Sequence, residues 1–557
     1  MKKGILFAPL LLIGLVFCFY QKNEEKKKFS CSLEKPFAIV VPSYNNSAYC
    51  KKNISSVLDQ NYTNYRVIYI DDCSTDDTFA KVDALISESP LAPRFILQRN
   101  TSNQGALANL YRAVHCCRDD EIVLILDGDD FLAHENVLKT LNKVYADPEV
   151  WMTYGNYLDY PSFKQEPLIC KELPQKVIAS GAFRSAEWSA SHLRTFYASL
   201  FKKIRLSDLL YEGKFFPMAA DLASTYPLLE MAGTHSRFIK DILYLYNRSN
   251  PLNDHKKNGS LQRACADCIK KLPHYSPLSG LPSTTLSSDA ADLVVFSYDR
   301  PLQLHALLES LEKYVSPLDS ITVIYRTSSL EFQTAYGTVH AAFPHVRFLA
   351  QSDRPQEDFK PLVLQAVYET KSPYILFAVD DMIVKDFIDL SASIRSLEAA
   401  QAYGFYFSHS THLKESYMRS CDQPLPPLVR LEGVLAWQFK QGEVDWKYPN
   451  SLDMVLYRKE EIRKDLFKMP FHNPNTFEDL WDKRAKLKKI GLFYEDSKVV
   501  GIPLNLVNPS SNRALHNYSP AQLLEKYKAG LKLDIAPLYQ VQNTSKHIPY
   551  EPTFIRR

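Results

Sequence analysis

The residues of this sequence that could do chemistry gather at the end of one apolar stretch. Residues 122–126 are all large and apolar, which is typical of a strand buried on both faces of a parallel sheet. Asp127, Gly128, Asp129 and Asp130 follow directly. Carboxylates this close repel one another unless a cation lies between them, and their oxygens suit Mg²⁺ or Mn²⁺. The run therefore indicates a divalent-cation site, although a simple Asp-Gly turn before a helix would explain the same residues.

The elements that must position these carboxylates alternate between strand and helix. Apolar runs predict strands over residues 37–41, 66–70, 94–98 and 122–126. Helical patterns lie between them, over residues 49–60, 78–88 and 106–117. Because strands that alternate with helices of this length form βαβ units, the fold class is α/β with a mostly parallel central sheet.

Four short motifs follow these strands in order. They are Val41-Pro-Ser-Tyr-Asn45, Ile70-Asp-Asp-Cys-Ser-Thr-Asp76, Asn103-Gln-Gly105 and Leu126-Asp-Gly-Asp-Asp130. Together they resemble the inverting family-two glycosyltransferases, whose GT-A fold is Rossmann-like, over residues 36–260. The resemblance implies that a sugar is transferred from a nucleotide-sugar donor such as a UDP-sugar. It also implies a cofactor, Mn²⁺ or Mg²⁺, that neutralises the charge on the departing diphosphate.

The resemblance assigns roles to individual residues. The candidates for binding the donor are Pro42, Tyr44, Asp72, Gly105, Asp127 and Gly128. Asp72 would hydrogen-bond the base, and Tyr44 would line the base pocket. Asp127 and Asp129 would form the DXD pair that holds the metal. His255 would be a third metal ligand, although a histidine in a polar loop is more often an ordinary surface residue.

The catalytic base is predicted downstream. Inverting transfer needs one carboxylate to take the proton of the acceptor hydroxyl. In the family this carboxylate stands on a loop before a helix, and Asp221 occupies the matching place. The family more often shows Glu-Asp there, whereas Ala220 precedes the aspartate here. The alternative is that Asp221 only caps the helix.

The pattern then begins a second time. Tyr44 and Asp127 are 83 positions apart, and Tyr298 and Asp380 are 82 apart, which indicates an internal duplication. The predicted organisation is an anchor and charged linker at 1–35, a glycosyltransferase domain at 36–271, a Pro/Ser-rich linker at 272–289 and a second GT-A-like domain at 290–557.

The second copy differs where chemistry would occur. Arg326 stands where Asp72 stood, so recognition of a base by a carboxylate is lost or changed. The candidate site residues of this domain are Tyr298, Asp380, Asp381, Glu478 and Asp479. The domain is either active on another donor, which would make the chain bifunctional, or a non-catalytic module for carbohydrate binding or assembly.

The N-terminus predicts contact with a membrane. Residues 4–20 carry no charge and end without a small-x-small cleavage site, which favours an uncleaved anchor over a signal peptide. Lysines are more numerous after this segment than before it, which places the catalytic domains in the cytoplasm. A signal peptide with export is the alternative.

Composition excludes several other classes. The net charge of +3 gives no reason to expect nucleic acid as a partner, and ten cysteines in 557 residues do not make a disulfide scaffold. A P-loop and a GxGxxG motif are both absent beside the strands. The predicted function is a membrane-associated glycosyltransferase of polysaccharide biosynthesis, with a glycan or lipid-linked acceptor. A nucleotidyltransferase is a weaker alternative, because no glycine-rich or basic phosphate loop follows the first strand.

Overall fold

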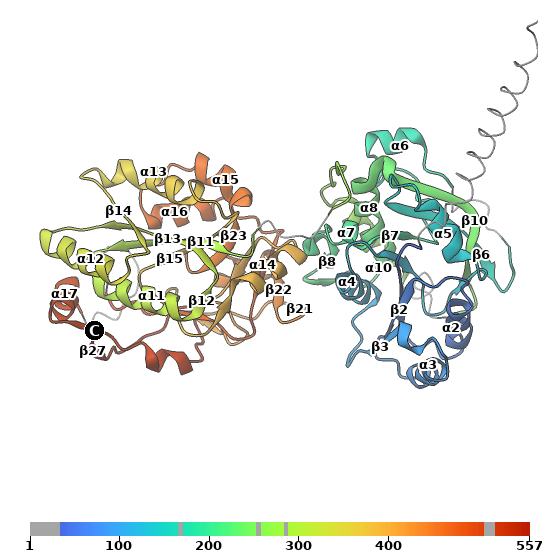
Figure 1. Cartoon of the computed structure of the whole chain (residues 1–557), viewed down its shortest axis with the longest axis horizontal. Helices are drawn as coiled ribbons and strands as arrows, with labels where there is room; N and C mark the ends of the chain where they lie inside the picture. The colour runs from blue at the N-terminus through green and yellow to red at the C-terminus, as the bar shows by residue number, and fades with distance from the viewer. Residues whose placement is uncertain (1–33, 165–170, 252–257, 283–287, 506–517) are drawn as a thin grey trace, which may run out of the picture.

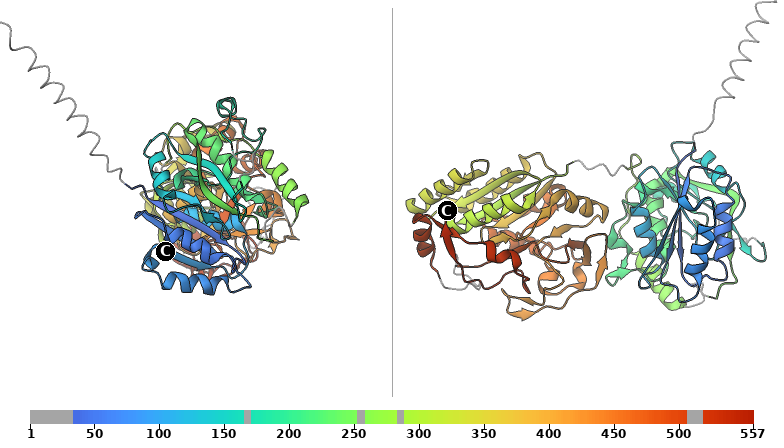
Figure 2. Two further views of the ribbon diagram at one scale, coloured as in Figure 1. Left: turned by 90° about the vertical axis from the view of Figure 1, so that its right-hand side faces the viewer. Right: turned by 60° about the horizontal axis from the view of Figure 1, so that its bottom comes forward.

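The computed structural model of this chain describes residues 34–164, 171–251, 258–282, 288–505 and 518–557. They form two lobes that lie side by side in Figure 1 and in the right-hand view of Figure 2. Within these ranges we find no helix both long and apolar enough to cross a bilayer. The predicted anchor at residues 4–20 and the predicted ligand His255 lie outside the described residues.

The first lobe is built from strands and helices in alternation. Its strands are β1 (Phe37–Ser43), β2 (Tyr65–Asp71), β3 (Phe95–Arg99), β4 (Ile122–Ile125), β5 (Phe131–Leu132), β6 (Met152–Tyr160), β7 (Thr195–Tyr197), β8 (Leu210–Tyr211), β9 (Lys214–Phe215) and β10 (Ser236–Asn247). Its helices are α2 (Cys50–Leu58), α3 (Thr78–Ser87), α4 (Ala106–His115), α5 (Val137–Val144), α6 (Gln175–Ser180), α7 (Ala198–Phe201), α8 (Ala220–Ala232) and α10 (Gly259–Lys270).

The second lobe is also built from strands and helices. Its strands are β11 (Ala291–Tyr298), β12 (Val315–Ser316), β13 (Leu318–Arg326), β14 (Arg347–Ala350), β15 (Tyr374–Val379), β16 (Met382–Val384), β17 (Ile388–Asp389), β18 (Gly404–Tyr406), β19 (Glu415–Ser416), β20 (Cys421–Asp422), β21 (Leu428–Arg430), β22 (Leu435–Gln438), β23 (Val455–Arg458), β24 (Ile490–Phe493), β25 (Val499–Gly501), β26 (Leu531–Leu533) and β27 (Phe554–Arg556). Its helices are α11 (Pro301–Tyr314), α12 (Leu330–Ala342), α13 (Pro355–Tyr368), α14 (Leu390–Ala399), α15 (Lys459–Lys468), α16 (Pro474–Asp482) and α17 (Pro520–Lys528).

The two central sheets repeat one topology. The first sheet has the order β3-β2-β1-β4-β7-β6-β10-β5, and the second contains β14-β13-β11-β15-β23-β18-β24. In both, four neighbouring strands run parallel, and the fifth strand of this order, β7 or β23, is antiparallel to its neighbours. The α/β class is therefore confirmed. Most strands of each sheet run in one direction, and the returning strand, which enters next to β4 or β15, runs in the opposite direction.

The central strands β1, β2 and β4 are buried on both faces, as their apolar runs predict, whereas the edge strand β3 is partly exposed. Val123 and Ile125 of β4 pack into one core cluster, whereas Ile122 and Leu124 pack into another on the opposite face. Successive side chains of a strand point to opposite faces, so an unbroken apolar run needs a layer on each side. This burial fixes where β4 ends, and with it the position of the acidic turn that follows.

The two lobes contact each other directly. The backbone N–H of Leu206 donates to the carbonyl of Ala400 at 3.2 Å. The hydroxyl of Tyr111, on α4, donates to the carbonyl of Ala399 at 3.4 Å. One hydrophobic cluster includes buried residues of both lobes, among them Leu206 and Val429. The helix α4, which follows the Asn103-Gln-Gly105 motif, thus lies against the second lobe.

Candidate active site

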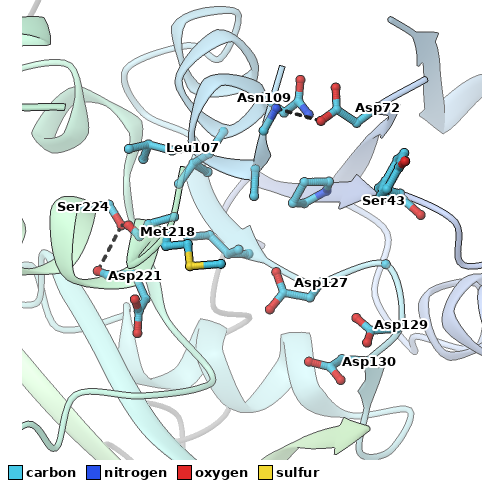
Figure 3. A pocket seen from close by; sticks show the side chains of 18 of the residues that line it. Ser43, Asp72, Leu107, Asn109, Asp127, Asp129, Asp130, Met218, Asp221 and Ser224 are labelled. Atoms are coloured by element: carbon cyan, nitrogen blue, oxygen red, sulfur yellow. Dashed lines mark hydrogen bonds between the residues drawn. The ribbon is translucent and has the colours of Figure 1, made fainter. Parts of the chain in front are cut away.

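A pocket of about 630 Å³ opens at the carboxyl ends of the central strands of the first lobe. Its lining includes the predicted residues Pro42, Tyr44, Asp72, Gly105, Asp127, Gly128, Asp129 and Asp221. Figure 3 shows that these side chains come from different elements, with Asp127, Asp129 and Asp130 on one turn and Asp221 on α8. The structure therefore brings together every predicted site residue of this lobe that it describes.

A buried asparagine on α2 holds the acidic turn. The Nδ2 of Asn53 donates to the carbonyl of Asp127 at 3.0 Å and to that of Asp130 at 2.8 Å. The N–H of Asp130 donates to the carbonyl of Asp127 at 3.0 Å, which closes the turn. Because both carbonyls are bound from one side, the carboxylates of the turn project toward the pocket.

Asp130 is the most deeply buried carboxylate of this turn. Its oxygens accept from the Tyr244 hydroxyl at 2.7 Å and from the N–H of Asn247 at 2.6 Å. Burial, followed by repulsion from Asp129 and Asp127, raises the pKa of Asp130 well above its ordinary value. A cation among these carboxylates would relieve that repulsion, so the chemistry of the donor set fits a divalent metal.

A histidine completes the acidic cluster. Ligand atoms of Asp127, Asp130 and His192 all lie within 4.8 Å of one another. The ring of His192 stacks on that of Tyr244, with centroids 4.5 Å apart. Burial and the neighbouring Arg194 lower the pKa of His192 well below its ordinary value, so the imidazole is neutral, the form that binds metals. Sequence analysis did not predict His192 as a ligand, because nothing in its local sequence marks it as one.

Two asparagines stand beside Asp129. The Nδ2 of Asn250 donates to Asp129 Oδ2 at 2.7 Å and to Asn46 Oδ1 at 3.3 Å. The Nδ2 of Asn46 donates in turn to the Ser43 hydroxyl at 3.0 Å. These donors are neutral amides, and they orient the Asp129 carboxylate without adding a charge of their own.

Asp72 organises the polar loop that precedes α4. Its Oδ1 accepts from the side chain of Asn100 at 2.7 Å and from the N–H of Gln104 at 2.8 Å. Its Oδ2 accepts from the N–H of Gly105 at 2.8 Å. A carboxylate can accept about four hydrogen bonds, so Oδ2 can still accept one from a ligand. Gly105 has φ +87°, a conformation that favours glycine.

Asp221 lies in the first turn of α8 and not at its N-cap. The N-cap position is held by Ala219, which makes no side-chain capping bond. The alternative interpretation of Asp221 as a helix cap is therefore wrong. The side chain borders the pocket, and Figure 3 shows it opposite the acidic turn.

The predicted site residues of the second lobe have other surroundings. The guanidinium of Arg326 lies 5.0 Å from the ring centroid of Tyr298. Asp380 and Asp381 both form ion pairs with Arg300. Glu478 is partly buried and Asp479 is exposed. Arg300 is a feature that the sequence did not suggest, because its partners lie 80 positions or more away.

Part of this chain is similar to known glycosyltransferases. A family model described as "Glycosyl transferase family 2" matches residues 38–203. Glycosyltransferase GlyG of Streptococcus pneumoniae is 25% identical over 289 residues, which cover 49% of this chain and 91% of that protein. An uncharacterized glycosyltransferase of Haemophilus influenzae is 34% identical over 120 residues, covering 22% of this chain and 46% of that protein.

The solved structures add little to this. A crystal structure of Staphylococcus aureus TarS, residues 1–349, is similar over 38% of this chain and 60% of that one, with 18% identity and a TM-score of 0.31. The chain thus spans nearly all of GlyG but less than two thirds of the other two proteins named here. The first lobe thus carries a stretch, residues 38–203, that matches the model of glycosyltransferase family 2, and the relatives named above are glycosyltransferases.

Proposed function

We propose that the first lobe transfers a sugar, with inversion, from a nucleotide-sugar donor to a hydroxyl of a glycan or lipid-linked acceptor. A UDP-sugar is the first donor to test. The observation that supports this best is that the acidic turn of Asp127 and Asp129 and the carboxylate of Asp221 line one pocket. An acidic turn alone would fit many cation sites, but a separate carboxylate on the opposite wall fits a base.

The residues divide the work between donor and acceptor. Asp72 and Tyr44 would hold the base on one side of the pocket. Asp127, with Asp129, Asp130 or His192, would hold Mn²⁺ or Mg²⁺, which when bound supplies positive charge against the diphosphate. Asp221 would accept the proton of the attacking hydroxyl, so that oxygen attacks the anomeric carbon as the bond to the diphosphate breaks.

Membrane association belongs to the same proposal. Residues 4–20 would anchor the chain with its lobes in the cytoplasm, where nucleotide sugars are made. The test is fractionation of cells that express the full chain or a chain without residues 4–20. We expect the full chain with the membranes and the shortened chain in the supernatant; equal distribution would contradict the anchor.

The decisive experiment measures turnover of the donor. The full chain is incubated with Mn²⁺ and a panel of nucleotide sugars, and release of the nucleoside diphosphate is followed. We expect hydrolysis with at least one UDP-sugar, removed by EDTA and reduced about 100-fold or more in Asp127→Asn. Asp83→Asn, an exposed carboxylate on α3 outside the pocket, is the matched control and should retain wild-type activity. Failure of every donor to bind or react would contradict the proposal.

A further inference from the structure

We propose that the second lobe takes no divalent cation at the place that corresponds to the metal site of the first, because the cationic side chains of Arg300 and Lys546 already pair with the carboxylates there. This inference uses the proposed metal site of the first lobe as its reference. It rests on three observations: the register of the two sheets, the partners of Arg300, and the partners of Lys546.

The central ladders show which positions correspond. Ile39 faces Leu124 in the first lobe, and Leu293 faces Leu376 in the second. Counting along the strands from these pairs gives the equivalent positions, which are Ser43 and Ser297, Asn46 and Arg300, Gly128 and Asp380, and Asp129 and Asp381. Sequence spacing matched Asp380 to Asp127. The register corrects this by one residue and places Asp380 where the first lobe has a glycine.

Arg300 lies where the first lobe has a neutral asparagine. One of its terminal nitrogens, Nη1, is 2.8 Å from Asp380 Oδ1 and 3.4 Å from Asp381 Oδ2. The other, Nη2, donates to the carbonyl of Asn505 at 2.5 Å. The side chain is only 10% exposed, so these contacts are shielded from water. A single guanidinium therefore bridges the two carboxylates and occupies the space between them.

A second cation fills the next position of the site. On β7 and β23, Thr195 and Leu456 face equivalent residues of β4 and β15. Three residues before them stand His192 in the first lobe and Asp453 in the second. The Oδ2 of Asp453 is 3.2 Å from the ammonium of Lys546, whose side chain is 6% exposed. The possible metal ligand of the first lobe is thus replaced by a carboxylate that has its own partner.

Lys546 is held firmly at this place by the backbone around it. Its carbonyl accepts from the N–H of Gly501 at 2.9 Å, and the N–H of Ile548 donates to the carbonyl of Gly501 at 3.0 Å. A β-carbon on Gly501 would lie 2.2 Å from the ring of His547, so only glycine allows this close approach. The C-terminal segment is therefore fixed against β25, and it delivers the ammonium to Asp453.

These contacts leave no favourable place for a metal ion. A divalent cation among Asp380, Asp381 and Asp453 would lie beside two buried positive charges, and the repulsion is strong where water is excluded. Displacing Arg300 would strand a buried guanidinium without its partners, which is costly as well. Metal-dependent transfer would therefore be confined to the first lobe, with one cation site in the part of the chain that the structure describes.

The test counts Mn²⁺ bound to the full chain by electron paramagnetic resonance. We expect one Mn²⁺ in the wild type, none in Asp127→Asn, and one in Asp381→Asn. If Asp127→Asn still binds one Mn²⁺, and adding Asp381→Asn to that variant removes it, the inference is wrong. That result would not contradict the proposed function. If no variant and not even the wild type binds Mn²⁺, the inference holds and the metal dependence of the proposed function is wrong.

A second measurement guards against unfolding of the variants. In the Asp127→Asn background, Arg300→Asn gives the second lobe the residue that the first lobe has at the equivalent position, Asn46. Without metal, we expect the Tm of this double variant to fall by roughly 5–10 °C, because Asp380 and Asp381 lose their cation. We expect Mn²⁺ to raise the Tm again, and Na⁺ at equal ionic strength to leave it low. Arg395→Asn, exposed on α14, should leave Tm unchanged. An unchanged Tm in Arg300→Asn would show that the guanidinium does not neutralise this site.

Discussion

A β-carbon placed on Gly128 would stand 2.5 Å from the hydroxyl oxygen of Ser43 and 2.8 Å from the Nδ2 of Asn46. The acidic turn of the first lobe therefore packs directly on the end of β1. Since Ser43 also accepts a hydrogen bond from Tyr69 at 2.8 Å, it cannot move aside freely. The spacing of the metal-site carboxylates depends on this contact between two strand ends.

Gly128→Ala should therefore displace the acidic turn. We expect donor turnover to fall at least about 10-fold, because small misplacements of reacting groups have large effects on rate. Gly337→Ala is the matched control. A β-carbon at Gly337 meets nothing within 4 Å, and alanine favours the helix α12, so activity and Tm should be retained or slightly raised. Wild-type kinetics in Gly128→Ala would contradict the argument from packing.

Asp221→Asn should separate catalysis from donor binding. The variant keeps the shape of the side chain but cannot take a proton, so we expect kcat of sugar transfer to fall about 10²- to 10⁴-fold. The KM for the donor and the Tm should stay near wild type, because Asp221 is not predicted to touch the donor. Asp241→Asn, exposed on β10, is the control. An equal loss in KM and kcat would instead assign Asp221 to binding.

Asp72→Asn tests the loop before α4. In the wild type all three donors reach a carboxylate oxygen, whereas the variant presents an amide nitrogen to some of them, so at least one of the three hydrogen bonds must be lost. We expect the KM for the donor to rise about 10-fold or more, since a hydrogen bond to a charged group contributes about 1.5–3 kcal/mol. Limited proteolysis should cut faster between residues 100 and 105. A donor KM that does not change would show that this loop takes no part in donor binding.

The pH dependence of stability should report Glu478. Burial, followed by repulsion from Asp453, raises the pKa of Glu478 to about 8 from an ordinary 4.5. At a pH between these two pKa values, Glu478 keeps its proton in the folded protein and releases it in the unfolded chain. Stability is therefore lost as pH rises from about 4.5 to about 8.

Glu478→Gln keeps an oxygen to accept from the N–H of Leu452, which is 2.8 Å away, and removes the ionisation. We expect the variant to unfold at a higher temperature than wild type at pH 9 and at a similar temperature at pH 5. Glu460→Gln, whose side chain is 86% exposed on α15, should follow the wild-type profile. If Glu478→Gln shows the wild-type slope between these pH values, Glu478 is ionised in the fold at neutral pH.

The sequence predicted best what is decided locally. The carboxylates Asp72 and Asp127 could be found because each directly follows an apolar strand, and parallel strands end at one edge of the sheet. Their convergence on one pocket follows from the fold. The role of Asn53, by contrast, depends on a helix placed against a turn more than 70 positions away.

The contacts of the second lobe show why the remainder was out of reach. The spacing between Tyr298 and Asp380 differs by one residue from that of the first lobe, so only the ladder register shows that Asp380 replaces a glycine. Arginine and lysine usually lie at the protein surface, and the sequence next to Arg300 and Lys546 has no pattern that predicts burial. Their burial beside carboxylates is settled by tertiary packing between distant segments, to which no local pattern is sensitive.

The hydrophobic cluster shared by the two lobes has a thermodynamic consequence. Domains joined only by a tether melt independently, each with its own transition. Here Tyr111 and Leu206 of the first lobe belong to the same buried cluster as Ala400 and Val429 of the second. Melting either lobe alone would expose this apolar surface to water, so the free energies of the two lobes are coupled. Calorimetry of the full chain should therefore show a single cooperative endotherm.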